Sequence, residues 1–191
     1  MSVHNFSVSY HALMINPQLL QLIKNRAVIH KEVVLASGQK SSYYIDARSL
    51  FLHGPSATLL GEALYELTKD LPMQAIGGPA VGALPLTVAA TMHYHKMGKE
   101  MEGFFIRKEA KAHGLQKTVE GVLPAGGKVV IVEDVFTTGG SVMTAIEAVK
   151  EAGAQVIALV GIVDRLQGAR ERFESMGLQF RTICTIRDLG V

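Results

Sequence analysis

Two adjacent carboxylates, Glu133 and Asp134, follow a run of apolar, mainly β-branched residues from Val129 to Val132. Val135 and Phe136 follow the two acids, and the small residues Thr137 to Ser141 come next. A helix-like stretch begins after them. This order predicts acidic groups at the carboxyl end of a buried strand, next to a loop whose backbone N–H groups can approach an anion. Carboxylates accept hydrogen bonds from sugar hydroxyls, and the start of a helix favours a phosphate. The segment therefore predicts a sugar-phosphate site, the alternative being solvated carboxylates before a turn.

The residues from Arg107 to Lys117 form a second segment whose side chains could take part in a reaction. They include Lys108, Lys111 and His113 and show no apolar periodicity, which predicts an exposed, mobile loop. Cations on such a loop can neutralise a departing anionic group while the loop closes and excludes water. Without the neighbouring acidic motif, a solvated basic turn would explain the segment as well.

Arg165 stands near the end of another apolar run, Val156 to Val163, with Asp164 between them. Taken alone, Arg165 fits a surface ion pair as well as a contact with a ligand carboxylate.

The composition is that of a soluble globular protein. The 191 residues, 48% hydrophobic and 19% charged, suffice for one domain with a substantial core. A net charge of +2, the lack of Trp and the lack of a basic stripe with stacking residues argue against nucleic-acid binding. The N-terminus lacks a signal-peptide pattern, and the uncharged stretch 75–92 carries several Pro and Gly residues, so we expect a cytoplasmic protein with no membrane span. Cys184 lies in a β-like run and is expected to be a buried core residue.

Short apolar runs alternate with helical patterns along the chain. The predicted strands are 31–36, 42–46, 73–77, 102–106, 128–133, 156–163 and 180–186. The predicted helices are 18–24, 56–70, 84–97, 140–152 and 167–176, the first preceded by Asn16 and Pro17. This alternation predicts an α/β fold with a mainly parallel central sheet, helices on both faces, and a ligand at the carboxyl ends of the strands.

Three segments carry a resemblance to a known family. Val130 to Ser141 resembles the motif with which type I phosphoribosyltransferases bind 5-phosphoribosyl 1-diphosphate (PRPP). Arg107 to Gly114 resembles the catalytic loop of the orotate phosphoribosyltransferases among them, and Val163 to Arg165 resembles their orotate-contacting strand end. Ser37 to Asp46 extends the resemblance, which runs from about residue 30 to the C-terminus. The acidic motif points only to the superfamily, whereas the loop points to orotate.

The resemblance implies a type I phosphoribosyltransferase fold in a single domain, 1–191, with a small hood from about residues 1–50 and a flexible catalytic loop. It implies a pentosyl-transferring glycosyltransferase of pyrimidine (UMP) synthesis. Such an enzyme moves the phosphoribosyl group of PRPP to orotate and yields orotidine 5′-phosphate and diphosphate. It also implies Mg²⁺, held mainly by the diphosphate with no named protein ligand. Finally, it implies a homodimer in which the loop 107–117 reaches the partner subunit's site.

The resemblance also assigns roles to residues. Catalysis is expected from Lys111, Glu133 and Asp134, the two acids holding the ribose 2′- and 3′-hydroxyls. The residues expected to bind PRPP are Arg107, Lys108, Lys111, His113, Glu133, Asp134, Val135, Phe136, Thr137, Thr138, Gly139, Gly140 and Ser141. Thr137 and Arg165 are expected to contact orotate.

Three positions depart from the family pattern, one of them Glu133, which stands where many relatives carry aspartate. Ala36 and Gly82 stand where many relatives carry lysine, which leaves more of the diphosphate contacts to Lys108 and Lys111. One alternative is a phosphoribosyltransferase for another nucleobase, which a panel of bases would separate. The other is a catalytically silent PRPP-sensing regulator of the same fold, against which the near-neutral charge and the basic loop both argue.

Overall fold

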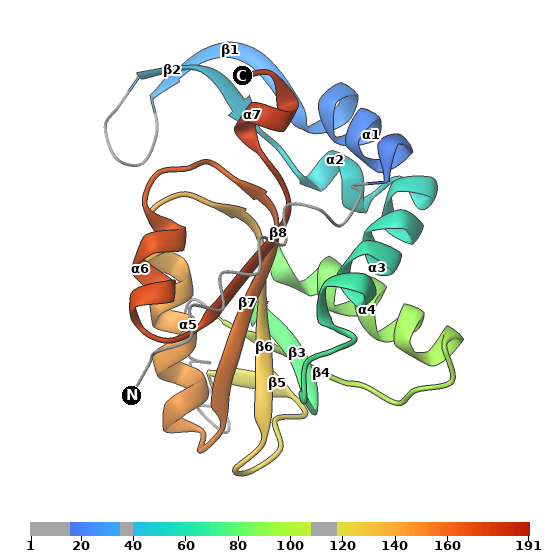
Figure 1. The fold of residues 1–191 in the computed structure, drawn as a ribbon, viewed down its shortest axis with the longest axis vertical. Coiled ribbons are helices and arrows are strands. Elements are labelled where there is room, and N and C mark those ends of the chain that lie inside the picture. The colour runs from blue at the N-terminus through green and yellow to red at the C-terminus, as the bar shows by residue number, and fades with distance from the viewer. Residues whose placement is uncertain (1–15, 35–39, 108–117) are drawn as a thin grey trace, which may run out of the picture.

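The structure is a computed structural model that describes residues 16–34, 40–107 and 118–191. Its centre is a six-stranded sheet in the order β5-β4-β3-β6-β7-β8, parallel throughout except for β4 with β5 (Figure 1). The strands are β3 (Ala75–Pro79), β4 (Glu102–Ile106), β5 (Val119–Gly121), β6 (Lys128–Phe136), β7 (Gln155–Asp164) and β8 (Gln179–Thr185). The predicted mainly parallel sheet is confirmed.

Helices cover both faces of this sheet (Figure 1). On one face lie α3 (Gly54–Thr68) and α4 (Ala83–Lys96), with α1 (Pro17–Ala27) and the short α2 (Arg48–Phe51) packed beside them. On the other face lie α5 (Gly140–Glu151) and α6 (Ala169–Ser175), and the short α7 (Ile186–Leu189) follows β8. The three-layer arrangement expected from the alternating pattern is therefore present.

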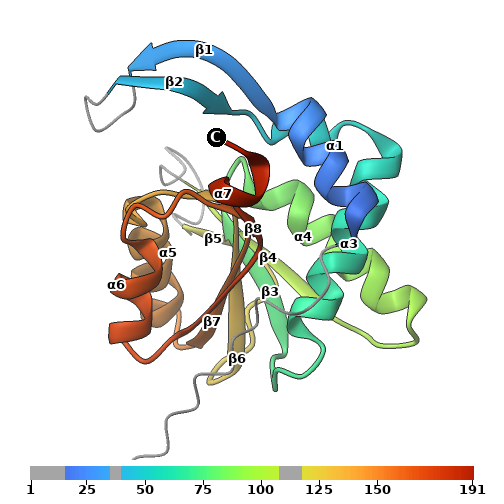
Figure 2. The same ribbon diagram turned by 45° about the horizontal axis from the view of Figure 1, so that its top comes forward.

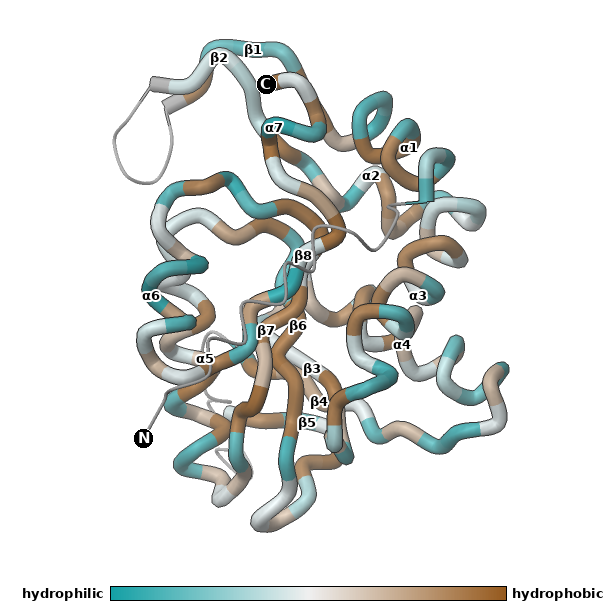
Figure 3. The backbone as a smooth tube through the Cα atoms, in the orientation of Figure 1, coloured by the Kyte–Doolittle hydropathy of each residue, from teal (hydrophilic) through white to brown (hydrophobic). Residues whose placement is uncertain are grey.

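The core is divided in two by the sheet. Along β6, Val130 and Val132 pack into the cluster shared with α3 and α4, whereas Val129 and Ile131 pack into the cluster shared with α5 and α6. Successive side chains of a strand point to opposite faces, so both faces of β6 are apolar. Figure 3 shows this as a hydrophobic centre beneath more polar helices. A parallel strand buried on both faces explains the continuous apolar run in the sequence.

A separate two-stranded antiparallel sheet forms the hood. Its strands are β1 (Val28–Val34) and β2 (Lys40–Ile45), and it lies over the end of the main sheet from which α7 leaves β8 (Figure 2). That end is the carboxyl end of the parallel strands. The hood therefore covers the edge at which a ligand is expected.

Several boundaries differ from the sequence prediction. The first hood strand begins at Val28, directly after α1, and β6 continues past the two acids to Phe136 because it pairs with β7 that far. The last strand ends at Thr185, where a reciprocal capping box with Asp188 starts α7. The short elements α2 and β5 were not predicted.

The burial of Cys184 and the structure of the uncharged stretch 75–92 were also predicted from the sequence. Cys184 is buried, and burial raises the pKa of its thiol to about 12, as suits an inert core residue. The uncharged stretch 75–92 forms β3, a turn and the first part of α4. Within the described ranges, no helix combines the length and the apolar character needed to cross a membrane.

Candidate active site

The two acids of the predicted site lie next to each other at the carboxyl end of β6, and each also contacts a different helix. Glu133 points towards α5, where its Oε2 accepts a hydrogen bond from Ser141 Oγ at 3.0 Å. The Asp134 carboxylate lies beside Gly82 at the start of α4, where a Cβ on that glycine would come. The neighbouring carboxyls of the pair are therefore held by α5 on one side and by the start of α4 on the other.

Glu133 is the more enclosed of the two, with 7% of its surface exposed. Burial, reinforced by the neighbouring Asp134 carboxylate, raises the pKa of Glu133 to about 8 from its ordinary 4.5. Hydrogen bonds from Ser141 Oγ and from the Asp134 backbone N–H oppose the rise without cancelling it. The Glu133 carboxyl therefore keeps its proton to a higher pH than an exposed glutamate does.

The loop after β6 leads into α5 through a left-handed residue. Gly139 is the N-cap of α5 with φ of +82°, and no side chain caps the helix. A helix start of this kind presents unpaired N–H groups of its first turn. The ring of Phe173 on α6 lies against the Cα of Gly139, and Arg172 Nη1 donates to the Thr138 carbonyl at 3.2 Å. Helix α6 thus packs against the loop and leaves the backbone N–H groups of the loop unobstructed.

The turn between β3 and α4 lies beside Asp134. Ala80 N donates to Ile106 O at 2.7 Å, and a Cβ added at Gly82 would lie 2.9 Å from Asp134 Cγ. A side chain at position 82 would displace the carboxylate, which explains why glycine occupies it. Gly77 and Gly78 are in a different situation: a Cβ there would overlap the carbonyl oxygens of the neighbouring strands. Close strand packing accounts for those two glycines.

Arg165 lies at the adjacent strand end and is buried, with 5% of its surface exposed. Its backbone N–H donates to Phe136 O at 2.9 Å, which joins it to the end of β6. Its guanidinium lies 4.9 Å from the centre of the Tyr43 ring, which comes from the hood. Arg165 and Thr137 are therefore both next to the acidic pair, at the edge that the hood covers.

The basic segment is described only at its first residue. Arg107 follows β4, its N–H donates to Thr118 O at 2.9 Å, and its Nη1 lies 3.6 Å from Glu120 Oε1 of β5. Lys108, Lys111 and His113 lie outside the described residues.

Val135 and Phe136 belong to the strand instead of the loop. Val135 N donates to Asp134 Oδ1 at 2.8 Å, and the Phe136 ring is buried against Phe173 and Phe180. The residues of the motif that form the loop proper are Thr137 to Ser141.

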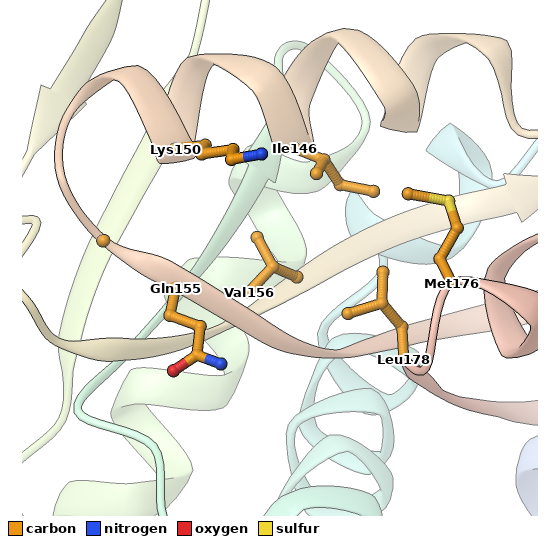
Figure 4. Close-up of a pocket in the computed structure, with 7 residues that line it drawn as sticks. Ile146, Lys150, Gln155, Val156, Met176 and Leu178 are labelled. Carbon is orange, nitrogen blue, oxygen red and sulfur yellow. The ribbon is translucent and has the colours of Figure 1, made fainter.

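A shallow hollow of about 340 Å³ lies at the opposite end of β7 from Arg165 (Figure 4). It is mainly apolar, and its lining residues are Ile146, Lys150, Ala154, Gln155, Val156, Met176 and Leu178. None of the predicted site residues lines it.

Comparisons with known proteins agree with this geometry. Residues 54–177 match the family described as "Phosphoribosyl transferase domain". The orotate phosphoribosyltransferase of Streptomyces avermitilis is 45% identical over 174 residues, which cover 91% of this chain and 96% of that protein. The chain belongs to the orotate phosphoribosyltransferase family. The prediction made from the three motifs is confirmed at this level.

Solved structures of the same family resemble this phosphoribosyltransferase in fold. The Mycobacterium tuberculosis H37Rv orotate phosphoribosyltransferase in complex with Fe(III) dicitrate has a TM-score of 0.81 and 38% identity, covering 91% of this chain and 98% of that one. The crystal structure of the same M. tuberculosis protein in complex with PRPP has a TM-score of 0.77 and 34% identity, with the same coverage. The type I phosphoribosyltransferase fold is thereby confirmed.

Three contacts of this phosphoribosyltransferase site were not predicted from the sequence. They are the ring of Tyr43 on Arg165, the ring of Phe173 under Gly139, and the bond from Arg172 to Thr138. Each joins residues far apart in the chain, and an aromatic or basic residue in an ordinary strand or helix gives no local signal of such a role. Only the glycine at 139, in a loop leading to a helix, hinted at close packing.

Proposed function

We propose that the protein transfers the phosphoribosyl group of PRPP to orotate and yields orotidine 5′-phosphate and diphosphate, a step of pyrimidine nucleotide synthesis. The observation that carries the proposal is the convergence, at one covered strand edge, of an acidic pair, an uncapped helix start and a buried arginine. These groups match a ribose, a phosphate and a carboxylate. Orotate supplies the carboxylate, and PRPP supplies the other two.

The acidic pair holds the ribose. Glu133 and Asp134 accept hydrogen bonds from the 2′- and 3′-hydroxyls, since carboxylates bind such donors strongly. Loss of diphosphate develops positive charge at the anomeric carbon, and nearby carboxylates stabilise that charge. The cations gathered around the diphosphate favour the ionised form of Glu133 and so oppose the rise of its pKa in the free protein. The displacement proceeds with inversion through a dissociative transition state.

The loop and the start of α5 hold the 5′-phosphate. The amides and hydroxyls available there belong to Thr137, Thr138, Gly139, Gly140 and Ser141. The positive end of the helix dipole adds to their hydrogen bonds. Because the Val135 N–H is already bonded to Asp134 and Phe136 lies in the core, we place the phosphate over 137–141.

Arg165 and Thr137 hold orotate. A guanidinium can donate two parallel hydrogen bonds to a carboxylate, and a buried one gains most from doing so. Arg165 Nε is buried and has no hydrogen-bond partner within the described ranges, so no side chain described there engages that nitrogen.

The basic segment neutralises the diphosphate. Arg107 is described, and Lys108, Lys111 and His113 follow it in sequence. We propose that Lys111 acts at the leaving diphosphate when the loop closes.

The site fits a magnesium ion that arrives with the substrate. No group of three or more His, Cys, Asp or Glu side chains in the described ranges could hold a metal. Three of the four oxygens of the acidic pair already accept hydrogen bonds from Asp134 N, Val135 N and Ser141. Mg²⁺ suits diphosphate oxygens and water, and it would offset the negative charge of the leaving group. We therefore propose that PRPP supplies most of its ligands.

A homodimer is proposed from the family and from the outer face of α4. Leu84, Val88 and Met92 are exposed there, spaced four residues apart on one side of the helix. An apolar row of this kind is typical of a contact surface, and a second copy of the chain is the partner we propose. The loop 107–117 of each subunit would then serve the partner's site. We further propose that the protein acts in the cytoplasm on small molecules, without nucleic-acid or membrane partners.

Turnover measured with a panel of acceptors tests the proposed function. Purified protein is mixed with PRPP and Mg²⁺, and orotate, uracil, adenine or hypoxanthine is offered in turn while diphosphate release is followed. Orotate alone should support rapid release. Consumption of PRPP with a purine but not with orotate would refute the proposal, and PRPP binding without turnover of any base would indicate a sensor.

A further inference from the structure

Among the residues that the structure describes, Arg165 is a buried cation that forms no ion pair. Its Nε has no hydrogen-bond partner in the part of the chain that the structure describes. The adjacent carboxylate, Asp164, is directed elsewhere, since its Oδ1 accepts from Leu166 N at 2.8 Å and its Oδ2 lies 3.7 Å from Arg170 Nε. A buried guanidinium in such surroundings is costly unless a ligand supplies acceptors. Its orientation must then be maintained by something other than an ion pair.

Tyr43 is the side chain that covers Arg165. The guanidinium carbon lies 4.9 Å from the centre of the tyrosine ring. On the hood, Tyr43 is paired with His30 of β1, and its carbonyl accepts a hydrogen bond from Ser41 Oγ at 2.7 Å. On the sheet, Arg165 is held by the bond from its N–H to Phe136 O at 2.9 Å. The contact therefore joins two separately anchored elements.

A ring above a guanidinium holds it in a way that an ion pair does not. The negative face of the ring attracts the cation but takes none of its N–H donors, which lie in the guanidinium plane. A ring at this distance can restrain the guanidinium without using any of its N–H donors. A carboxylate that needs two parallel N–H bonds requires both conditions.

We propose that Tyr43 is a positioning residue for the acceptor, which holds the Arg165 guanidinium in the plane that receives the orotate carboxylate. The proposal rests on the proposed function, because it needs an acceptor that carries a carboxylate. It also gives the hood a part in choosing the acceptor, since the ring that orients Arg165 comes from β2. PRPP, which is held by the end of β6 and by α5, does not depend on this contact.

The test compares Tyr43→Leu with Tyr43→Phe in steady-state turnover, with KM measured separately for orotate and for PRPP. Loss of the ring should raise the KM for orotate about 3- to 30-fold, the range expected from the strength of a cation–π contact. The KM for PRPP and kcat at saturation should stay within about twofold. Tyr43→Phe keeps the ring and should restore the wild-type KM for orotate. Thermal melting of both variants checks that the hood remains folded.

A double-mutant cycle separates action through Arg165 from a direct contact. In an Arg165→Ala background, Tyr43→Leu should change the affinity for orotate by less than about twofold, because the group that it orients is gone. An unchanged KM for orotate in Tyr43→Leu overturns the proposal. A parallel rise of both KM values, or a full effect of Tyr43→Leu in the Arg165→Ala background, does so too. Wild-type protein that fails to turn over orotate overturns the proposed function, and this inference falls with it.

Discussion

Replacing Glu133 with Gln tests whether the buried carboxyl of the active site is protonated in the free protein. Glutamine keeps the size of the side chain and one carbonyl oxygen that can accept the hydrogen bond from Ser141, but its NH2 group cannot accept the bond from Asp134 N. That loss costs the same at every pH and cancels when stabilities at two pH values are compared. It removes the proton equilibrium and the negative charge. The comparison therefore isolates the cost of ionising this group.

The direction of the effect follows from the raised pKa. A carboxyl whose pKa is higher in the folded state keeps its proton where the unfolded chain has lost it. The stability that the protonated Glu133 contributes is thus present below its ordinary pKa of 4.5 and is lost as the pH rises to about 8. Because one pKa unit is worth about 1.4 kcal/mol, complete ionisation costs about 5 kcal/mol. Between about pH 5.5 and about pH 8.5 the loss should be about 3 kcal/mol.

Urea unfolding at these two pH values, without ligands, measures the effect as a free energy of unfolding. Wild-type protein should lose about 3 kcal/mol more than Glu133→Gln on going to the higher pH. The matched control is Glu147→Gln, which removes a carboxyl from the exposed side of α5 and should follow the wild-type curve. Parallel pH dependences of wild type and Glu133→Gln would refute a protonated Glu133. Addition of PRPP and Mg²⁺ to the wild type near neutral pH should release a proton, which calorimetry in buffers of different ionisation enthalpy detects.

Three further predictions concern the loops and the proposed interface. Gly139→Ala should raise the KM for PRPP at least about tenfold, because the φ of Gly139 is +82° and the new Cβ would meet the Phe173 ring. The control, Gly153→Ala, has a φ of +81° and open space around the Cβ, so it should lower stability without changing the KM. Equal KM values for the two variants would contradict this prediction. Lys111→Ala should lower kcat about 100-fold or more in a steady-state assay, because a cation that offsets the charge of the leaving diphosphate is lost. An unchanged kcat would exclude a catalytic loop. Val88→Glu should convert a dimer into monomers of low activity in light scattering and assay, and an active dimer would refute the α4 interface.

The elements of the main sheet were predictable because their signals are local. Four consecutive apolar residues from Val129 to Val132 require burial on both faces, and β6 and β7 pair as that pattern predicts. The first helix was equally clear, since Asn16 accepts hydrogen bonds from the N–H groups of Gln18 and Leu19 as an N-cap should. The position of the acidic motif at a strand end followed from the same patterns.

The parts that were not predicted depend on pairing with distant residues. Strand β5 is three residues long and exists because it pairs with β4. Strand β6 extends through its two acids because it keeps its pairing with β7 there. The low strand propensity of acidic residues argues against such an extension when the sequence is considered alone. The contact of Tyr43 with Arg165 depends on how the hood sits over the sheet. No spacing along the chain encodes that arrangement.

Consecutive acids at the end of a sheet have a consequence for how such a site can be altered. Glu133 takes its surroundings from α5, through Ser141, and Asp134 takes its surroundings from the start of α4, through Gly82. The two carboxylates therefore belong to different layers of the protein, although they are neighbours in sequence. A substitution in one helical layer would change the surroundings of one carboxylate directly and would reach the other through the contact between the two. The affinity for a ribose bound by both carboxylates would then depend on the spacing between the two helical layers. A shift of one layer against the other would change that affinity.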